Sequence, residues 1–141
     1  MEHNNKNTFR ISDESVNSYG LIVKTDGINL DRFIKNPVML YSHSTEGGNI
    51  GRWENIRTEN NALFADAVFY EKDERAKAVK EKVESGFLRG CSISIDVVEL
   101  KGNTITKSNL LEVSICDIPS NENALKLSYK EKPVTDFKGL S

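Results

Sequence analysis

The chain of 141 residues has few of the residue types that build disulfide frameworks and metal sites. It contains two cysteines, Cys91 and Cys116, and two histidines, His3 and His43. Two cysteines are too few for a disulfide framework, so we expect free thiols in a reducing compartment. No Cys-x-x-Cys or His-x-x-His spacing occurs, and a zinc site would have to be assembled from scattered residues. We therefore expect no metal and no cofactor.

The sequence also lacks long apolar runs and an excess of positive charge. No stretch approaches the roughly 20 apolar residues that a membrane helix needs. The segment Met1–Arg10 is polar, which is not typical of a secretory signal. A net charge of −2 and a pI near 5.7 give no bulk attraction to nucleic acid or to an anionic membrane. We expect a cytoplasmic protein with neither nucleic acid nor a membrane as partner.

Most of the remaining pattern predicts β-strands. The segments in question are short, rich in β-branched or aromatic residues, and bounded by turn residues. They are Tyr19–Lys24, Val38–His43, Ile50–Arg57, Ala62–Phe69, Gly90–Leu100 and Thr104–Ile118. The third and fourth are expected to form a hairpin around residues 59–61.

Helical patterns are fewer. Asp73–Ser85 places Ala76, Val79 and Val83 on one narrow stripe, and Gly86 follows where a C-cap glycine belongs. A short helix is expected at Asn29–Lys35, before a proline that disfavours helix in the residue preceding it. The fold class predicted is β-dominated α+β: an antiparallel, closed or nearly closed barrel-like sheet with one main helix at about 73–85 and short flanking helices.

The domain organisation follows from the same patterns. Residues 19–127 are expected to form a single domain. Residues 1–18 are polar and are expected to form a flexible arm, with one edge strand at Thr8–Ile11. Residues 128–141 are charged and are expected to form a loose C-terminal tail.

Two of the predicted strands carry polar residues on one face. Alternation puts Ser92, Ser94 and Asp96 on one face of the first strand, and Glu112, Ser114 and Cys116 on one face of the second. A three-residue turn at Lys101–Asn103 would set Ser92 opposite Glu112, with Cβ atoms about 5 Å apart. A slip of one residue would send them to opposite faces.

These residue types are those that nucleophilic catalysis needs. A serine hydroxyl needs a base to take its proton, and the base needs a third group that orients it. His43 ends a predicted strand just before a loop, whereas His3 lies in the expected arm. Glu112 lies among apolar residues, where carboxylates are seldom found unless they are exposed or paired. Each of these residues also has an ordinary structural explanation, so the pattern alone leaves the question open.

The order of the segments resembles the caudoviral prohead serine protease family, which shares a fold with the herpesvirus assemblins. The segments that carry the resemblance are YGLIVKTDGINLDRFIKNPVMLYSHS, NIGRWENI, NALFADAVF, the helix with ESGFLRGCSISI, and LLEVSICDIPSNENA. Together they run from Tyr19 to Ala124. Members of the family typically show these motifs in this order.

The resemblance implies roles for particular residues. The family's histidine corresponds to His43 as general base, and its nucleophile to Ser92 in Gly-Cys-Ser-Ile. The third member would be Glu112 as the orienting acid, although assemblins use a second histidine there. Family members usually have glycine and an aromatic residue after Ser-Ile. Here Ser94 and Ile95 stand instead, which leaves a second hydroxyl on the face of Ser92.

The resemblance also implies a biological setting. It implies a serine endopeptidase that processes capsid and scaffold precursor proteins, through an acyl-enzyme, during phage prohead maturation. The protein would act as a homo-oligomer inside the assembling prohead, in the cytoplasm of an infected or prophage-carrying bacterium.

Three alternatives remain open at this point. The chain could be a catalytically inactive assembly module of the same fold. A metal-dependent hydrolase is disfavoured by the scarcity of ligands. A cysteine protease using Cys91 is disfavoured because alternation turns Cys91 away from the face of Glu112.

Overall fold

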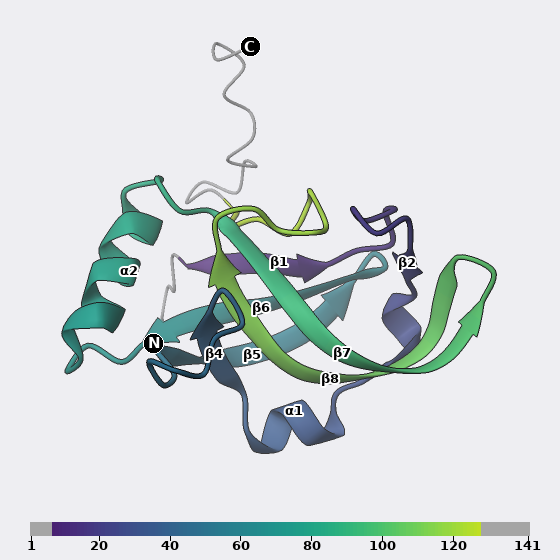
Figure 1. Ribbon diagram of the computed structural model, residues 1–141, viewed down its shortest axis with the longest axis horizontal. Coiled ribbons are helices and arrows are strands. Elements are labelled where there is room, and N and C mark those ends of the chain that lie inside the picture. The colour runs from purple at the N-terminus through teal and green to yellow at the C-terminus, as the bar shows by residue number, and fades with distance from the viewer. Residues whose placement is uncertain (1–6, 128–141) are drawn as a thin grey trace, which may run out of the picture.

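The computed structural model describes residues 7–127, which form eight strands, two α-helices and one 3-10 helix (Figure 1). In chain order these are β1 (Thr8–Ser12), β2 (Ile22–Val23), η1 (Thr25–Gly27), β3 (Ile28–Asn29), α1 (Asp31–Lys35), β4 (Val38–Tyr41), β5 (Gly51–Glu59), β6 (Ala62–Phe69), α2 (Glu74–Glu84), β7 (Gly90–Lys101) and β8 (Thr104–Cys116). The β-dominated α+β class and the barrel-like sheet are confirmed.

The sheet is mixed, so the expectation of an antiparallel sheet is only partly right. Strands β1, β6, β5 and β4 follow one another in antiparallel pairs, and β7 is antiparallel to β8. By contrast, β2, β3 and β4 all pair with β8 in parallel. These three short strands run one after another along the same edge of β8, separated by η1 and α1. Alternation of apolar residues predicts a strand but not its direction, so the parallel pairing could not be predicted from the sequence.

The barrel is nearly closed, and β1 and β7 are the two strands at the gap. At one end of the gap, residues 124–127 lie between them in an extended conformation. Arg10 N–H donates to Leu125 O at 3.0 Å, and Cys91 N–H donates to Ala124 O at 3.0 Å. The chain after β8 therefore closes the barrel at this end only.

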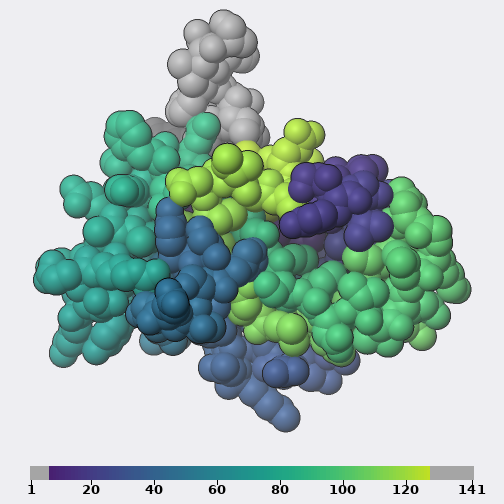
Figure 2. Space-filling view, in the orientation of Figure 1, coloured from purple at the N-terminus to yellow at the C-terminus, as the bar shows by residue number. Residues whose placement is uncertain are grey.

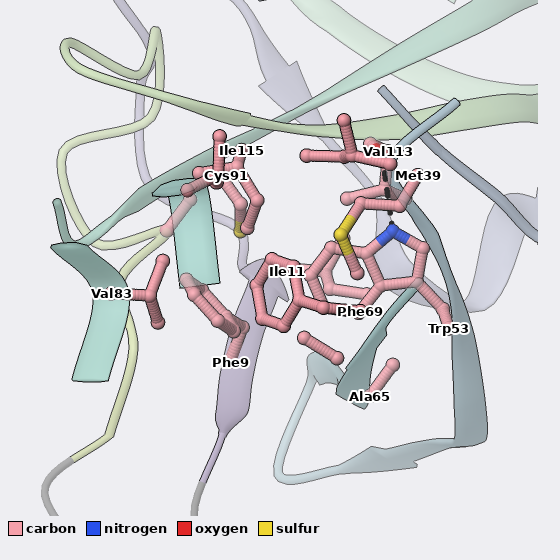
Figure 3. Packing of buried hydrophobic residues seen from close by; sticks show 14 of the residues in the cluster. Phe9, Ile11, Met39, Trp53, Ala65, Phe69, Val83, Cys91, Val113 and Ile115 are labelled. Atoms are coloured by element: carbon pink, nitrogen blue, oxygen red, sulfur yellow. Dashed lines mark hydrogen bonds between the residues drawn. The ribbon is translucent and has the colours of Figure 1, made fainter. Parts of the chain in front are cut away.

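Apolar side chains from nearly every strand fill the barrel (Figure 3). Phe9 and Trp53 meet edge to face, with ring centroids 5.4 Å apart. Each side chain of this size that is fully buried stabilises the fold by about 1.5–3 kcal/mol relative to leaving it exposed. Helix α2 adds Ala76, Val79 and Val83 to the same core, as its predicted stripe requires.

The N-terminal segment agrees with expectation only in part. The edge strand expected at Thr8–Ile11 is present as β1, at Thr8–Ser12, and it pairs with β6. Phe9 and Ile11 are almost fully buried, so residues 8–12 belong to the barrel and not to a flexible arm. The predicted strand at 19–24 shrinks to β2, because Gly20 has φ +79 and the Asn17 side chain accepts from Tyr19 and Leu21 N–H. The predicted tail at 128–141 lies outside the described residues.

Several local predictions are confirmed. Asn60 and Asn61 join β5 to β6 with φ of 51° and 61°, as a two-residue type I′ hairpin turn requires. Helix α2 starts after the N-cap Asp73 and ends at Glu84, with Ser85 as its C-cap, followed by Gly86 with φ +87.

In residues 7–127, no helix is both long and apolar enough to cross a membrane.

Candidate active site

The β7–β8 ladder carries the polar face predicted from the sequence, in a different register. Ser92 pairs with Ser114, and Ser94 pairs with Glu112, so the predicted pairing of Ser92 with Glu112 is wrong. Two features cause the shift. Lys101 pairs directly with Thr104 across a two-residue turn, and the ladder is further shifted by a bulge between Ser94 and Ile95. A shift of two residues preserves the face of every side chain, so these serines and Glu112 still lie on one side.

The same bulge changes which leucine enters the core. Leu110 is fully buried, whereas the neighbouring Leu111, which unbroken alternation would place on the face of Val113 and Ile115, is only half-buried. An extra residue in one strand reverses the alternation beyond it. The sequence alone does not show where the bulge falls.

A tight turn presents His43. Ser42 and His43, at the end of β4, both have positive φ, 51° and 60°. Ser44 N–H closes the turn by donating to Tyr41 O at 3.1 Å. Positive φ costs a non-glycine residue free energy and is found mainly where surrounding contacts fix the conformation, often at functional sites. Here His43 N–H donates to the Ser114 hydroxyl at 2.8 Å, which ties the turn to β8.

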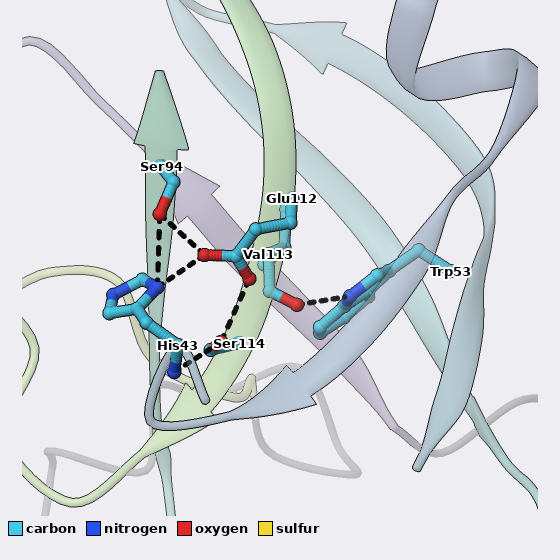
Figure 4. Close-up of polar contacts among 6 residues, drawn as sticks. All are labelled: His43, Trp53, Ser94, Glu112, Val113 and Ser114. Atoms are coloured by element: carbon cyan, nitrogen blue, oxygen red, sulfur yellow. Dashed lines mark hydrogen bonds and ion pairs between the residues drawn. The ribbon is translucent and has the colours of Figure 1, made fainter. Parts of the chain in front are cut away.

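Glu112 lies at the centre of a hydrogen-bonded network (Figure 4). Its Oε2 accepts from the His43 ring at Nδ1 and from the Ser94 hydroxyl, the latter at 2.5 Å. Its Oε1 accepts from the Ser114 hydroxyl at 2.8 Å. Ser94 Oγ also lies 3.1 Å from His43 Nδ1. A mostly buried carboxylate is thus fully partnered, as burial requires.

The network shifts the pKa values of both members of the ion pair. The hydrogen bond that the His43 ring donates to Glu112 raises the pKa of His43 above its ordinary value, against the opposing effect of partial burial. Burial by itself would raise the pKa of Glu112, but hydrogen bonds from His43, Ser94 and Ser114 outweigh it and hold that pKa below its ordinary value. Both shifts favour an ionised carboxylate beside a readily protonated imidazole.

The two ring nitrogens of His43 have different surroundings. Nδ1 faces Glu112 and Ser94, whereas Nε2 points away from both (Figure 4). A groove of about 610 Å³ borders this side of the molecule, and His43, Ser92 and Ser94 all line it. The Ser92 side chain makes no hydrogen bond to another residue in the range 7–127. The structure therefore brings His43 and Glu112 into direct contact and places Ser92 in the same groove.

The two thiols lie in environments that suppress reactivity. Cys91 is fully buried and points into the barrel (Figure 3), and burial raises the pKa of its thiol well above the ordinary value. Cys116 lines the groove, yet burial foremost, together with the nearby carboxylates, raises its pKa to about 11. A thiol with such a pKa stays protonated at neutral pH and is a poor nucleophile.

Sequence reasoning overlooked two supporting residues. Ser114 is fully buried and links the His43 backbone to Glu112. Trp53 donates from its indole N–H to Val113 O at 3.0 Å, which fixes β8 beside Glu112 (Figure 4). Ser114 could have been found from its position two residues after Glu112, on the same face. No local signal marks Trp53.

Comparison with known proteins adds the family. No curated protein gives a significant match, and no solved structure does. Among protein-family models, the one described as Caudovirus prohead serine protease matches residues 13–136. That span includes the whole of the network around Glu112, from the His43 turn to the end of β8. The chain therefore belongs to the caudovirus prohead serine protease family.

Proposed function

We propose that the protein is a serine endopeptidase in which Ser92 is the nucleophile, His43 the general base and Glu112 the acid that orients it. The observation that carries the proposal is the contact of Glu112 with Nδ1 of His43, which leaves Nε2 facing away from the carboxylate. In a catalytic triad the acid binds one ring nitrogen and the nucleophile uses the other. Ser92 lines the groove that also contains His43.

Ser94 is the rival nucleophile, and its geometry argues for a different role. Its hydroxyl lies on the Nδ1 side, where Glu112 already binds, and donates its proton to the carboxylate. A hydroxyl in this place holds the carboxylate and the imidazole together, and it does not contact Nε2, the ring nitrogen that a nucleophile would use. We assign Ser94 and Ser114 as positioning residues.

The proposed reaction has two steps, acylation of Ser92 and hydrolysis of the acyl-enzyme. Nε2 of His43 takes the proton of Ser92 Oγ while this oxygen attacks the peptide carbonyl carbon, and the imidazolium then protonates the leaving amine as the C–N bond breaks. The product is an ester between Ser92 and the acyl part of the substrate. Water then gives a proton to Nε2, its oxygen attacks the ester carbon, and the proton returns to Ser92 Oγ as the carboxylic product leaves.

The substrates we propose are the capsid and scaffold precursor proteins of the prohead, because the family is named for proteases of the prohead. The proposal also includes homo-oligomerisation and activity within the assembling prohead, in the bacterial cytoplasm, with neither nucleic acid nor a membrane as partner.

The test is cleavage of the cognate capsid precursor by the purified full chain, read by mass spectrometry of the products. Ser92→Ala should fold normally, shown by an unchanged circular dichroism spectrum, and give no cleavage. Ser94→Ala is the matched control, since it removes the same atom two residues along the same face and should retain cleavage at a reduced rate. Unaltered cleavage by Ser92→Ala would exclude Ser92. Failure of the wild type to cleave the precursor would favour an inactive assembly module.

A further inference from the structure

A second, apolar cavity lies next to the groove, in the part of the barrel gap that residues 124–127 leave open. It measures about 210 Å³ and passes between the segment around Tyr19–Val23 and the inner face of β7. Its β7 wall is formed by Cys91, Ser92, Ile93, Ile95 and Val97. In the space-filling view, the purple N-terminal segment lies against the yellow residues that follow β8 and the green β7–β8 hairpin (Figure 2).

The cavity and the groove meet at the proposed nucleophile. Four residues line both of them: Tyr19, Ser92, Ile93 and Ser120. A molecule lying in the groove at Ser92 is therefore in reach of the apolar cavity without crossing any packed core. This continuity distinguishes the cavity from an isolated packing defect.

The edge of β7 beside the cavity is available for pairing. Cys91 N–H points away from β8, to Ala124, so alternation along the strand directs the N–H and C=O of Ile93 to the same edge. Among the described strands, only β8 pairs with β7. Residues 124–127 already pair with this edge and with β1 at the neighbouring end of the gap, so an extended chain fits between the two strands.

From these observations we infer that the substrate binds as an extended strand on the β7 edge at Ile93, and that the cavity receives one of its apolar side chains close to the cleaved bond. The inference rests on the proposed function for its position at Ser92. A cavity of about 150 Å³ lined by apolar residues holds benzene, so this one has room for a leucine or phenylalanine side chain. The occupant is thus a peptide segment with a large apolar residue, bound by main-chain pairing and one specificity pocket.

The test measures peptide binding and cleavage separately, with full-length protein. Fluorescent peptides spanning a mapped cleavage site, each with one apolar residue changed to alanine, are titrated into Ser92→Ala by fluorescence anisotropy. Changing the residue that occupies the cavity should weaken binding about tenfold or more, the discrimination that apolar pockets give, and should lower kcat/KM of the wild type equally. Equal affinity for every alanine peptide would overturn the inference.

Two neighbouring valines provide a matched pair of variants. Val97 lines the cavity and is 48% exposed, whereas Val98 is 58% exposed and lies outside the lining. Val97→Asp should weaken binding of the apolar peptide about tenfold or more, while Val98→Asp should leave it within twofold. Equal effects of the two variants would contradict a pocket.

The outcomes separate this inference from the proposed function. Peptide binding that depends on Val97 but is not followed by hydrolysis would support the specificity pocket and contradict the proposed peptidase activity. Hydrolysis without preference for an apolar residue would support the peptidase activity and contradict the specificity pocket. A change of sedimentation coefficient in Val97→Asp with unaltered peptide affinity would assign the cavity to contact between copies of the chain, and would also overturn the inference.

Discussion

The two faces of the β7–β8 ladder contrast sharply, although the same two strands form both of them. The inner face carries Cys91, Val113 and Ile115, which are fully buried and contribute to the barrel core. The outer face carries Glu112, which is 9% exposed, and Ser114, which is fully buried, and both are held by hydrogen bonds. The hydrophobic effect that stabilises the inner face has no directional requirement. The buried polar groups of the outer face, by contrast, each need a hydrogen-bond partner. Loss of an inner-face group should therefore lower the stability and leave the pH dependence of activity unchanged, whereas loss of an outer-face group should have its main effect on activity.

The largest effect is expected for Ser92→Ala. Loss of a triad nucleophile lowers kcat by about 10⁴–10⁶. Because the Ser92 hydroxyl has no hydrogen-bond partner among residues 7–127, the free energy of unfolding should change by no more than about 0.5 kcal/mol. Peptide cleavage rates and urea denaturation measure the two quantities. A large loss of stability with unaltered cleavage would reverse the contrast between the faces.

His43→Asn should cost nearly as much activity while preserving the turn. Asparagine adopts positive φ more readily than most residues, so φ of 60° at this position should be retained. We expect kcat to fall by about 10⁴ or more, with the thermal midpoint almost unchanged. An inactive variant that has also unfolded would show that His43 is needed for structure, and would weaken its assignment as base.

Glu112→Gln should lower kcat by up to about 10⁴, the loss seen when a triad acid becomes an amide. Activity requires neutral His43, and Glu112 raises the pKa of that imidazole. The acid limb of the wild-type pH–rate profile should therefore lie above the ordinary histidine pKa, and the variant should move it to lower pH. An acid limb that does not move would contradict the pairing.

Stability should depend on pH in two windows, an acidic one set by Glu112 and one at higher pH set by His43. The pKa of Glu112 is lower in the folded protein than its ordinary value. Its stabilising contribution is therefore complete above the ordinary carboxyl pKa and is lost as pH falls through the lowered one. His43 has a raised pKa, so its contribution is complete below the ordinary histidine pKa and is lost as pH rises through the raised one. Urea denaturation of wild type and Glu112→Gln across this range measures both.

On the inner face, Val113→Ala should have the reverse signature. Val113 is fully buried in the core, and removing buried methyl groups costs about 1–3 kcal/mol of the free energy of unfolding. The position of the acid limb should stay that of the wild type, because the side chain points away from Glu112. A shifted pH profile in this variant would show that the two faces are coupled.

The smallest effect is expected for Ser94→Ala. It removes one of the hydrogen bonds that Glu112 Oε2 accepts, and we expect a loss of about tenfold in kcat/KM with a small shift of the acid limb. Kinetics across pH, beside the Ser92 variant, measure this difference. A loss as large as that of Ser92→Ala would make Ser94 the candidate nucleophile.

The sequence predicted the parts of this site that depend on alternation. Two-residue periodicity placed Ser92, Ser94, Glu112 and Ser114 on one face, and this holds because the ladder is displaced by an even number of residues. Alternation could not predict the register, which depends on the length of the turn at Gly102 and on the bulge beside Ser94. It also could not predict the parallel pairing of β4 with β8, which brings His43 to Glu112.

Backbone conformation was the other missing element. Histidine is enriched at positive φ but serine is not, and a single histidine is too weak a local signal to predict the turn that presents the imidazole. The conformation is fixed by contacts distant in sequence, such as that of the His43 N–H with Ser114. The main helix, by contrast, carries its own cap and stripe and was predicted almost to the residue.

The most direct test of the central claim is covalent labelling of the full-length protein with a fluorophosphonate, followed by peptide mapping. The activated serine oxygen attacks phosphorus, fluoride leaves, and the adduct marks that residue. We expect the label on Ser92, with none in Ser92→Ala or His43→Asn and continued labelling in Ser94→Ala. A label on Ser94 that persists when Ser92 is alanine would contradict the account.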